Sequence, residues 1–261
     1  MCGRFVSASS PETIAEYFGA AFGGESLGDN YNVAPTNDVY GIVADPAPAA
    51  APEGARADAA APTSSTDGRR LEVFHWGLIP SWAKDRKIGA KMINARAETL
   101  GEKPAFKGVF RKHRCIIPMD GFYEWQAATE SSPLDAKGKP RKQPMFIHRI
   151  DDEPLAVAGL WARWKDPAAE TDSGDDMWLH SATVVTTSAN ATMRPVHDRM
   201  PVILPRSVWD EWLDPDMHDT GRLSELLVPA ADDILTMHPV SYDVNNVRNK
   251  DAHLVDAVAA A

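Results

Sequence analysis

The sequence predicts an α+β fold, a single domain built on a mostly antiparallel, strongly curved β-sheet with a few flanking helices. The chain has 261 residues, of which 44% are hydrophobic and 25% charged, and this composition is typical of a folded globular protein with its own core. Short apolar runs of strand length recur along the chain, whereas segments with helical spacing are fewer. We therefore expect one domain over residues 1–255.

Five apolar runs have the length of β-strands, which is about 5–6 residues. In chain order they are 39–43, 114–118, 145–150, 155–161 and 182–187. No internal repeat relates them to one another. They predict a sheet whose strands come from most of the length of the chain.

Three segments have the apolar spacing of helices, namely 10–22, 205–213 and 221–228. The first begins with a serine that is followed by Pro11, an order that is typical of a helix start. We expect all three to flank the sheet.

Three other segments have loop composition. Residues 44–70 consist mainly of Ala, Pro and small polar residues and contain no large apolar side chain, so we expect an exposed or disordered insertion. Residues 128–143 and 165–176 are polar, contain Pro and Gly, and are expected to connect strands.

The charge of the chain is unevenly distributed. The formal net charge is −10, which is not typical of a nucleic-acid-binding protein as a whole. Residues 79–143, however, contain 14 Lys and Arg against 7 Asp and Glu, whereas residues 207–261 contain 3 against 11. The basic window also contains the aromatic residues Trp82, Phe106, Phe110, Phe122, Tyr123 and Trp125. Cations mixed with flat aromatic rings suit single-stranded nucleic acid; the alternative is that the aromatic rings are core and the cations a solvated surface.

The cysteine and histidine patterns exclude several site types. Cys2 and Cys115 are too few for a disulfide framework and lack the spacing of a zinc site. The histidines form no HExxH motif, and no P-loop or GxGxxG occurs, so we expect no metal and no cofactor. No apolar stretch is long enough for a membrane span or a signal peptide. We expect a cytoplasmic protein in a reducing compartment, associated with the nucleoid if the source is bacterial.

Cys2 can acquire a chemistry that Cys115 cannot. If Met1 is removed, Cys2 carries a free amine beside its thiol, and such an aminothiol can condense with an aldehyde and close a five-membered thiazolidine. Ordinary pKa values of about 7.7–8.0 for an α-amine and about 8.5 for a thiol predict useful fractions of neutral amine and thiolate near neutral pH. The alternative is that Cys2 is only a small residue at a processed start.

Several sequence blocks occur in an order that identifies a family. They are MCGRF at 1–5, YNVAPT at 31–36, WGLIPSW at 76–82, INARAET at 93–99, RCIIPMDGFYEW at 114–125, AGLW at 158–161, VVTTSAN at 184–190 and HDRMPVIL at 197–204. With these blocks the chain resembles the SRAP family, the SOS response-associated peptidases or abasic-site-processing proteins. The resemblance covers nearly the whole chain, is weaker at 240–250, and is lost in 44–70 and the two polar loops.

The resemblance implies a covalent reaction that each protein molecule performs once, because it remains attached to its substrate. The processed Cys2 attacks the ring-opened aldehyde of an abasic site in single-stranded DNA and remains attached through a thiazolidine, which shields the lesion in the DNA damage response. Removal of Met1 is attributed to the same site, so an autopeptidase and a lyase-like crosslinking activity are expected. The expected partner is single-stranded DNA containing abasic sites. No membrane partner is expected, and a monomer is sufficient for this chemistry.

The resemblance also implies which residues surround Cys2. Asn94, Glu124 and His197 match the polar residues that the family places there. An amide can hold the amine or a substrate oxygen, a carboxyl can carry protons, and an imidazole can protonate the sugar ring oxygen near neutral pH. Each residue alone also has a purely structural alternative. Asn94 could be a turn or cap residue, Glu124 could form a salt bridge, and His197 could be structural.

The same motifs supply candidates for DNA binding. Arginines there can clamp phosphates and tryptophans can stack on bases, although Trp76 and Trp82 have core packing as an even alternative. The candidates are Arg4, Pro35, Trp76, Trp82, Arg96, Trp125 and Arg199. Pro35 is expected to form a rigid wall, and Glu98 to pair with a nearby arginine.

Two other functions remain open from the sequence. An N-terminal-nucleophile amidohydrolase also exposes a processed cysteine, although the following Arg-Phe and the absence of a synthase domain weigh against it. A non-covalent single-strand-binding module, in which Cys2 is incidental, predicts that Met1 is retained and that intact and abasic strands bind equally.

Overall fold

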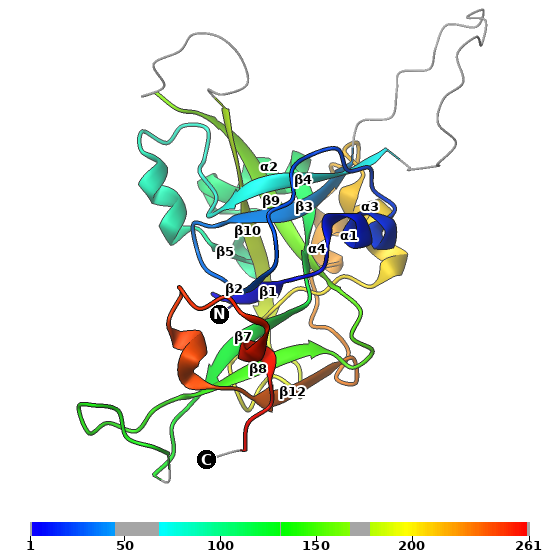
Figure 1. Ribbon diagram of the computed structural model, residues 1–261. Helices are drawn as coiled ribbons and strands as arrows, with labels where there is room; N and C mark the ends of the chain where they lie inside the picture. The colour runs from blue at the N-terminus through cyan, green and yellow to red at the C-terminus, as the bar shows by residue number, and fades with distance from the viewer. Residues whose placement is uncertain (1, 45–67, 131, 168–177, 260–261) are drawn as a thin grey trace, which may run out of the picture.

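The structure, a computed structural model, describes residues 2–44, 68–130, 132–167 and 178–259 (Figure 1). Its strands form two sheets. The larger sheet contains β11 (Arg199–Pro201), β10 (Trp178–Ser188), β4 (Arg69–Trp76), β3 (Asp38–Ala44), β6 (Arg114–Met119) and β9 (Leu155–Lys165) in that order, with β5 (Asn94–Arg96) paired to β10. The smaller sheet contains β12 (Leu235–Pro239), β8 (Gln143–Arg149), β7 (Gly121–Gln126), β1 (Phe5–Ser7) and β2 (Asn30–Val33).

The larger sheet closes on itself. β9 pairs with β6 on one side and with β10 on the other, and β10 is linked back to β6 through β4 and β3. All pairings in both sheets are antiparallel except those of β10 with β4 and with β5. The α+β class and the mostly antiparallel, curved sheet predicted from the sequence are therefore confirmed.

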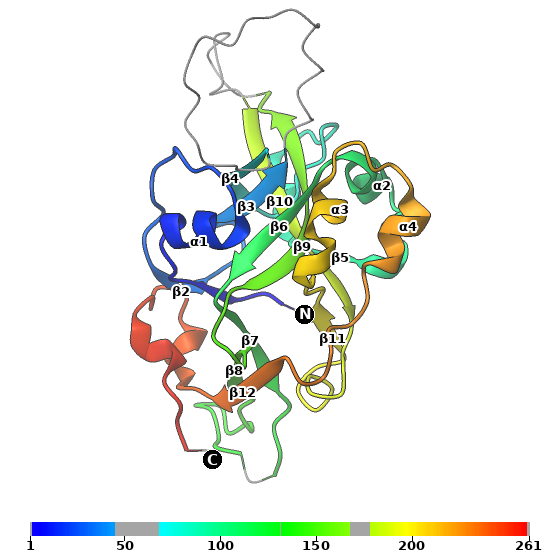
Figure 2. The same ribbon diagram turned by 90° about the vertical axis from the view of Figure 1, so that its right-hand side faces the viewer.

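In the described part of the chain, four α-helices flank the sheets (Figure 2). They are α1 (Pro11–Phe18), α2 (Pro104–Lys112), α3 (Trp209–Leu213) and α4 (Thr220–Glu225). The described 3₁₀ helices include η1 (Arg86–Lys91), η2 (Ala97–Thr99), η4 (Arg206–Val208), η5 (Tyr242–Asn245) and η6 (Ala252–Val255). No helix of the described ranges combines the length and the apolar character that crossing a bilayer requires.

The five predicted strands occur in the structure as β3, β6, β8, β9 and β10, some of them longer than predicted. The helix predicted over 10–22 ends earlier, at Phe18, because Gly19 turns the chain with a φ of 62°. The segment 205–213 divides into η4 and α3, and the segment 221–228 contains α4.

The boundaries of the predicted insertion at 44–70 are wrong at both ends. Ala44 belongs to β3, and Arg69 and Arg70 belong to β4, because the two strands pair up to Ala44 opposite Arg69. The rest of the segment lies outside the described residues, apart from Gly68. As predicted, the other two polar segments connect strands, β7 to β8 and β9 to β10, with 168–177 outside the described residues.

The N-terminal strand β1 brings the smaller sheet against the larger one. β1 pairs with β7 and β2, and it lies between the two parts of the molecule in both views (Figures 1 and 2). Phe5 of this strand is buried and its ring meets Trp76 of β4 edge-on, with 5.0 Å between the ring centroids. The residues just before β1 are consequently held at the junction of the sheets.

The buried thiol of Cys115, in β6, predicts a loss of stability in alkaline solution. Burial raises the pKa of this thiol, and the charge of Glu72 adds to the shift. An unfolded thiol releases its proton at about pH 8.5 while the folded thiol keeps it, so above that pH the free energy of unfolding falls by about 1.4 kcal/mol per pH unit. The variant Cys115→Ala should reduce this slope by that amount in urea unfolding series above pH 8.5. An unchanged slope would show that Cys115 ionises equally in both states.

Candidate active site

Cys2 lies buried at the junction of the two sheets. It belongs to a hydrophobic cluster that includes Phe5, Trp76 and Phe122, so residues of both sheets surround it. Burial raises the pKa of its thiol, the charge of Glu124 raises it further, and a hydrogen bond from the backbone N–H of Arg4 opposes the shift. In the chain that still carries Met1, the thiol is therefore protonated near neutral pH, and the thiolate fraction expected after removal of Met1 stays a prediction.

Asn94 contacts Cys2 from the larger sheet. It is the first residue of β5, which is fixed by parallel pairing with β10, opposite Val184. Its side-chain Nδ2 donates a hydrogen bond of 2.8 Å to the backbone carbonyl of Cys2. Its Oδ1 is buried and accepts no hydrogen bond within the described part of the chain. Asn94 thus fixes the position of Cys2 and keeps one buried acceptor available.

Glu124 reaches the site from the smaller sheet. It lies on β7, and this strand is held beside β1 by the pairing of Phe122 with Phe5 and by a 2.9 Å hydrogen bond from Tyr123 N to Arg4 O. Glu124 is nearly fully buried. Its charge acts on the Cys2 thiol and raises the pKa of that thiol, so the two groups lie near each other. A buried carboxyl beside a thiol suits proton transfer.

His197 lies between β10 and β11. Its Nδ1 is 2.8 Å from Oδ1 of Asp198 and also accepts a 3.0 Å hydrogen bond from the backbone N–H of Arg199. Two residues just before it, Met193 and Val196, belong to the same hydrophobic cluster as Cys2. The loop that carries His197 is therefore packed against the site.

The three candidate arginines have different surroundings. Arg4 is half-buried: its guanidinium donates to Oδ1 of Asn32 and to the carbonyl of Val244, and it lies 5.8 Å from the centre of the Trp125 ring. Arg96, on β5 two residues beyond Asn94, is exposed.

Arg199 is bonded within the protein, and its role as a phosphate clamp stays a prediction. Its guanidinium forms a bidentate ion pair with Glu98, at 2.6 and 2.9 Å, and also donates to the carbonyl of Thr186. The prediction that Glu98 pairs with an arginine is thus confirmed. These bonds also fix the position of Arg199 beside the loop of His197.

The three candidate tryptophans differ in exposure. Trp76 is fully buried and its Nε1 donates to the carbonyl of Ile93. Its ring is therefore packed in the core, which was the alternative to stacking on a base. Trp125 is half-buried, with its Nε1 bonded to Oδ1 of Asn245 at 2.7 Å. Trp82 is 60% exposed.

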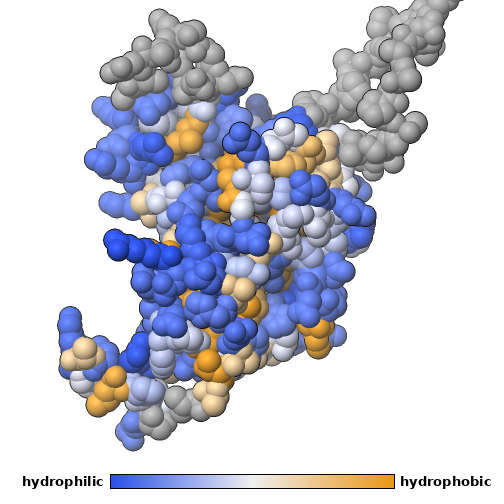
Figure 3. All heavy atoms as spheres, in the orientation of Figure 1, coloured by the Kyte–Doolittle hydropathy of each residue, from blue (hydrophilic) through white to orange (hydrophobic). Residues whose placement is uncertain are grey.

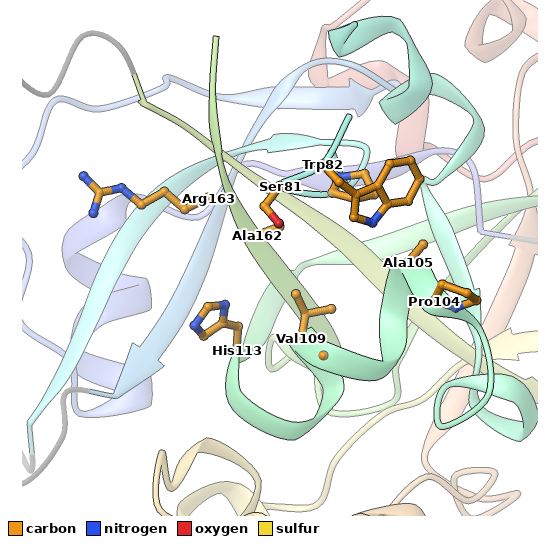
Figure 4. Close-up of a pocket in the computed structure, with 10 residues that line it drawn as sticks. Ser81, Trp82, Pro104, Ala105, Val109, His113, Ala162 and Arg163 are labelled. Carbon is orange, nitrogen blue, oxygen red and sulfur yellow. The ribbon is translucent and has the colours of Figure 1, made fainter. Parts of the chain in front are cut away.

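Trp82 borders a pocket of about 250 Å³ whose other walls include Pro104, Val109 and Arg163. In Figure 4 the Trp82 ring stands over Pro104 and Ala105 at the start of α2, and Arg163 lies at the other end of the pocket. The arrangement provides a flat ring beside an apolar wall, while the guanidinium of Arg163 points away from Trp82 and lies 4.3 Å from the centre of the Trp178 ring.

Pro35 lies partly exposed in the turn between β2 and β3. The turn is closed by hydrogen bonds between Ala34 and Asn37, and Thr36, with a φ of 71°, donates its N–H to the carbonyl of Trp76. The turn that carries Pro35 is therefore fixed by hydrogen bonds, and its role as a wall of the site stays a prediction.

Sequence reasoning missed the role of Asn32. It is fully buried, its Oδ1 accepts from Arg4, and its Nδ2 lies within hydrogen-bond distance of the carbonyls of Val244, Asn246 and Asn249. Asn32 therefore ties Arg4 to the C-terminal segment 242–250. The only signal in the sequence was its place in the YNVAPT block. Within the described ranges, no group of three His, Cys, Asp or Glu residues is arranged to hold a metal ion.

Comparisons with known proteins agree with this architecture. The family model of the SOS response associated peptidases (SRAP) matches residues 1–247. The abasic site processing protein YoaM of Bacillus subtilis is 39% identical over 259 residues, which cover 98% of each chain. The abasic site processing protein HMCES of Xenopus tropicalis is 34% identical over 203 residues, 73% of this chain and 58% of its own.

Solved structures share the fold. A protein from Bacteroides thetaiotaomicron superimposes with a TM-score of 0.76 over 98% of this chain and all of its own, at 23% identity. A phage-related protein from Bordetella bronchiseptica superimposes with a TM-score of 0.61 over 92% of this chain and 94% of its own, at 29% identity. With the family model matched over nearly its whole length and a relative aligned from end to end, this chain belongs to the SRAP family.

Proposed function

We propose that this protein processes abasic sites in single-stranded DNA by forming a covalent thiazolidine through Cys2 after Met1 is removed. Relatives along the whole length of the chain bear the name abasic site processing protein. The observation that carries the proposal is the placement of Cys2, which is held by Asn94 and faces Glu124 at the junction of the sheets.

The protonated state of the Cys2 thiol favours an order of steps. Because burial and Glu124 disfavour the thiolate, the freed α-amine is the first nucleophile. Its nitrogen attacks C1′ of the ring-opened sugar, the carbonyl oxygen takes up protons and leaves as water, and an imine forms. The sulfur then adds to the imine carbon and the thiol proton passes to the nitrogen. The aldehyde and the aminothiol thus yield a thiazolidine and one water.

The polar residues have distinct roles in these steps. Asn94 fixes the backbone of Cys2, and its buried Oδ1 can accept a hydrogen bond from the new amine. Glu124 transfers protons between the amine, the departing water and the thiol. His197 protonates the sugar ring oxygen as the ring opens. Removal of Met1 is a hydrolysis of the Met1–Cys2 bond that consumes one water at the same site.

Intact-mass measurement tests the proposal. After incubation with a single strand containing one abasic site, the adduct should survive heating in denaturant, and its mass should equal that of the protein without Met1 plus the DNA minus one water. Absence of an adduct, or an adduct that retains Met1, would overturn the proposal. Glutamine-dependent ammonia release would indicate an amidohydrolase, and equal affinity for intact and abasic strands without an adduct would indicate a binding module.

We further propose that Trp82 stacks on a base of the bound strand. Trp82→Ala should weaken binding of a single-stranded oligonucleotide roughly 5- to 150-fold, since a stacked base contributes about 1–3 kcal/mol. Trp82→Phe should retain part of the affinity. Because the ring is 60% exposed, neither change should lower the melting temperature by more than a few degrees. Unchanged affinity in Trp82→Ala would exclude the ring from the DNA path.

A further inference from the structure

A small pocket lies beside the proposed active site, between η5 and the β7–β8 hairpin. Its volume is about 180 Å³, below the usual range of about 300–1,000 Å³ for sites of drug-sized ligands, so it suits a single flat ring. The lining mixes amides and hydroxyls with apolar side chains: Gln126, Ala127, Thr129, Ser132, Pro133, Gln143, Met145, Pro239 and Tyr242. This composition is that of a site for one polar, planar group.

Tyr242 lines the pocket and carries an unsatisfied hydroxyl. Its Oη is buried and makes no hydrogen bond within the described residues, a state that costs free energy until a partner pairs with it. The guanidinium of Arg141 lies 3.6 Å from the centre of the Tyr242 ring, so the ring is stacked in place. The side chain that carries the hydroxyl is therefore held in place, and a small shift of a bound group or of Tyr242 is enough to pair it.

The pocket is joined to the active site through η5 and β7. The helix η5 contains both Tyr242 and Asn245, and Asn245 accepts the hydrogen bond of Trp125. On the hairpin, Met145 lines the pocket and pairs directly with Glu124. A strand bound at Glu124 and Trp125 would thus reach this pocket within its next nucleotides.

The hairpin beyond the pocket presents cations. It projects from the body at the lower left of Figures 1 and 3, where the surface shown carries both hydrophilic and hydrophobic residues. Its turn is fixed by Asp135, whose Oδ1 accepts from the backbone N–H groups of Lys137 and Lys139, and by Gly138 with a φ of 74°. The side chains of Lys137, Lys139 and Lys142 are exposed. Exposed cations on an ordered turn suit phosphates.

We propose that this pocket receives one unpaired base of the DNA strand on one side of the lesion, with the hairpin lysines on the adjoining phosphates. The inference rests on the proposed function, since it assigns the path of the strand that the active site holds. A basic face and an aromatic-bordered pocket together bind single strands with little sequence preference. Tyr242 is a positioning residue for the DNA and takes no part in the bond-forming steps.

The variant Tyr242→Phe tests the pocket. It removes only the unpaired hydroxyl and leaves the ring under Arg141. We expect affinity for a tailed abasic strand to fall about 2- to 10-fold, while the melting temperature of the free protein is unchanged or higher. A lower melting temperature with unchanged affinity would show that the hydroxyl is structural, and would overturn the assignment.

Strands with a one-sided tail test the path. Three oligonucleotides are compared: one with unpaired nucleotides only on the 5′ side of the abasic site, one with them only on the 3′ side, and one with a minimal flank. The double variant Lys137→Ala/Lys139→Ala should weaken binding of one tailed strand alone and reduce the slope of log affinity against log salt by about 1.4. The control, Lys165→Ala/Arg206→Ala, removes the same charge from exposed sites elsewhere and should leave the slope unchanged.

The minimal strand separates this inference from the proposed function. If the hairpin only guides the flanking strand, the double variant should crosslink the minimal strand at the rate of the unmodified protein. If the double variant loses affinity equally for both tailed strands, or for neither, the proposed path of the strand is overturned. The proposed chemistry at Cys2 is not affected by that result. Failure of the unmodified protein to crosslink the minimal strand would instead count against the proposed function.

Discussion

Cys2→Ala should form no heat-stable adduct with an abasic strand, whereas Cys2→Ser should form only an imine that heating releases and borohydride reduction traps. Without sulfur the imine carbon has no neighbouring nucleophile that closes a stable ring, and a hydroxyl closes it less favourably than a thiol. Denaturing gels of the heated and the reduced samples measure both products. The expected change is from nearly complete crosslinking to none.

Cys115 provides the matched control. It is also buried and free, but its nitrogen lies in an amide and β6 fixes it in the sheet, so Cys115→Ala should crosslink as the unmodified protein does. The masses of the purified variants must show that Met1 is absent, because a retained residue would block the amine for a different reason. A heat-stable adduct of Cys2→Ala in normal yield would contradict the proposed chemistry.

Sequence patterns located the long strands better than the short elements. The runs that became β6 and β9 are apolar over most of their length because both faces are covered. The three-residue strands β1 and β5 show no usable periodicity, and their pairings depend on partners distant in the sequence.

Helix α2 was missed for a related reason. Its stability comes from burial of Phe106 and Phe110 and from Arg114, which is itself buried and donates to the carbonyls of Phe110 and Arg111 at the helix end. Within the sequence, Gly108 and the surrounding cations obscured this pattern. Arg114 is held in this position by a hydrogen bond from its Nε to the carbonyl of Trp212 in α3, and this distant contact is not visible in a local window.

The prediction of the candidate site depended on the order of the sequence motifs more than on any local pattern. Asn94 and Glu124 come from different sheets, and only the fold brings them to Cys2. The two tryptophans of the WGLIPSW block look alike in the sequence, yet Trp76 ends a buried strand and Trp82 stands exposed. The protonation state of Cys2 could not be anticipated either, because it depends on burial at the junction of the sheets.

Glu124→Gln should slow crosslinking about 10²- to 10⁴-fold, the range expected when a positioned proton carrier is lost. The amide keeps the size of the side chain but cannot accept and release protons as water leaves. Glu124→Asp should retain part of the rate, because aspartate has the same carboxyl group on a side chain that is one methylene shorter. Single-turnover kinetics with an abasic strand in excess measure the rates, and melting temperatures exclude loss of folding.

The same substitution, Glu124→Gln, should lower the pKa of the Cys2 thiol. The carboxylate of Glu124 raises the pKa of this thiol, so removing its charge should lower the pKa and increase the thiolate fraction near neutral pH. Thiolate absorbance followed against pH in a Cys115→Ala background reports Cys2 alone. Slower crosslinking together with a more ionised thiol would separate proton transfer from thiol activation, since a reaction limited by thiolate attack would become faster. An unchanged rate with a lowered thiol pKa would remove Glu124 from the proton-transfer steps and leave it only an electrostatic role.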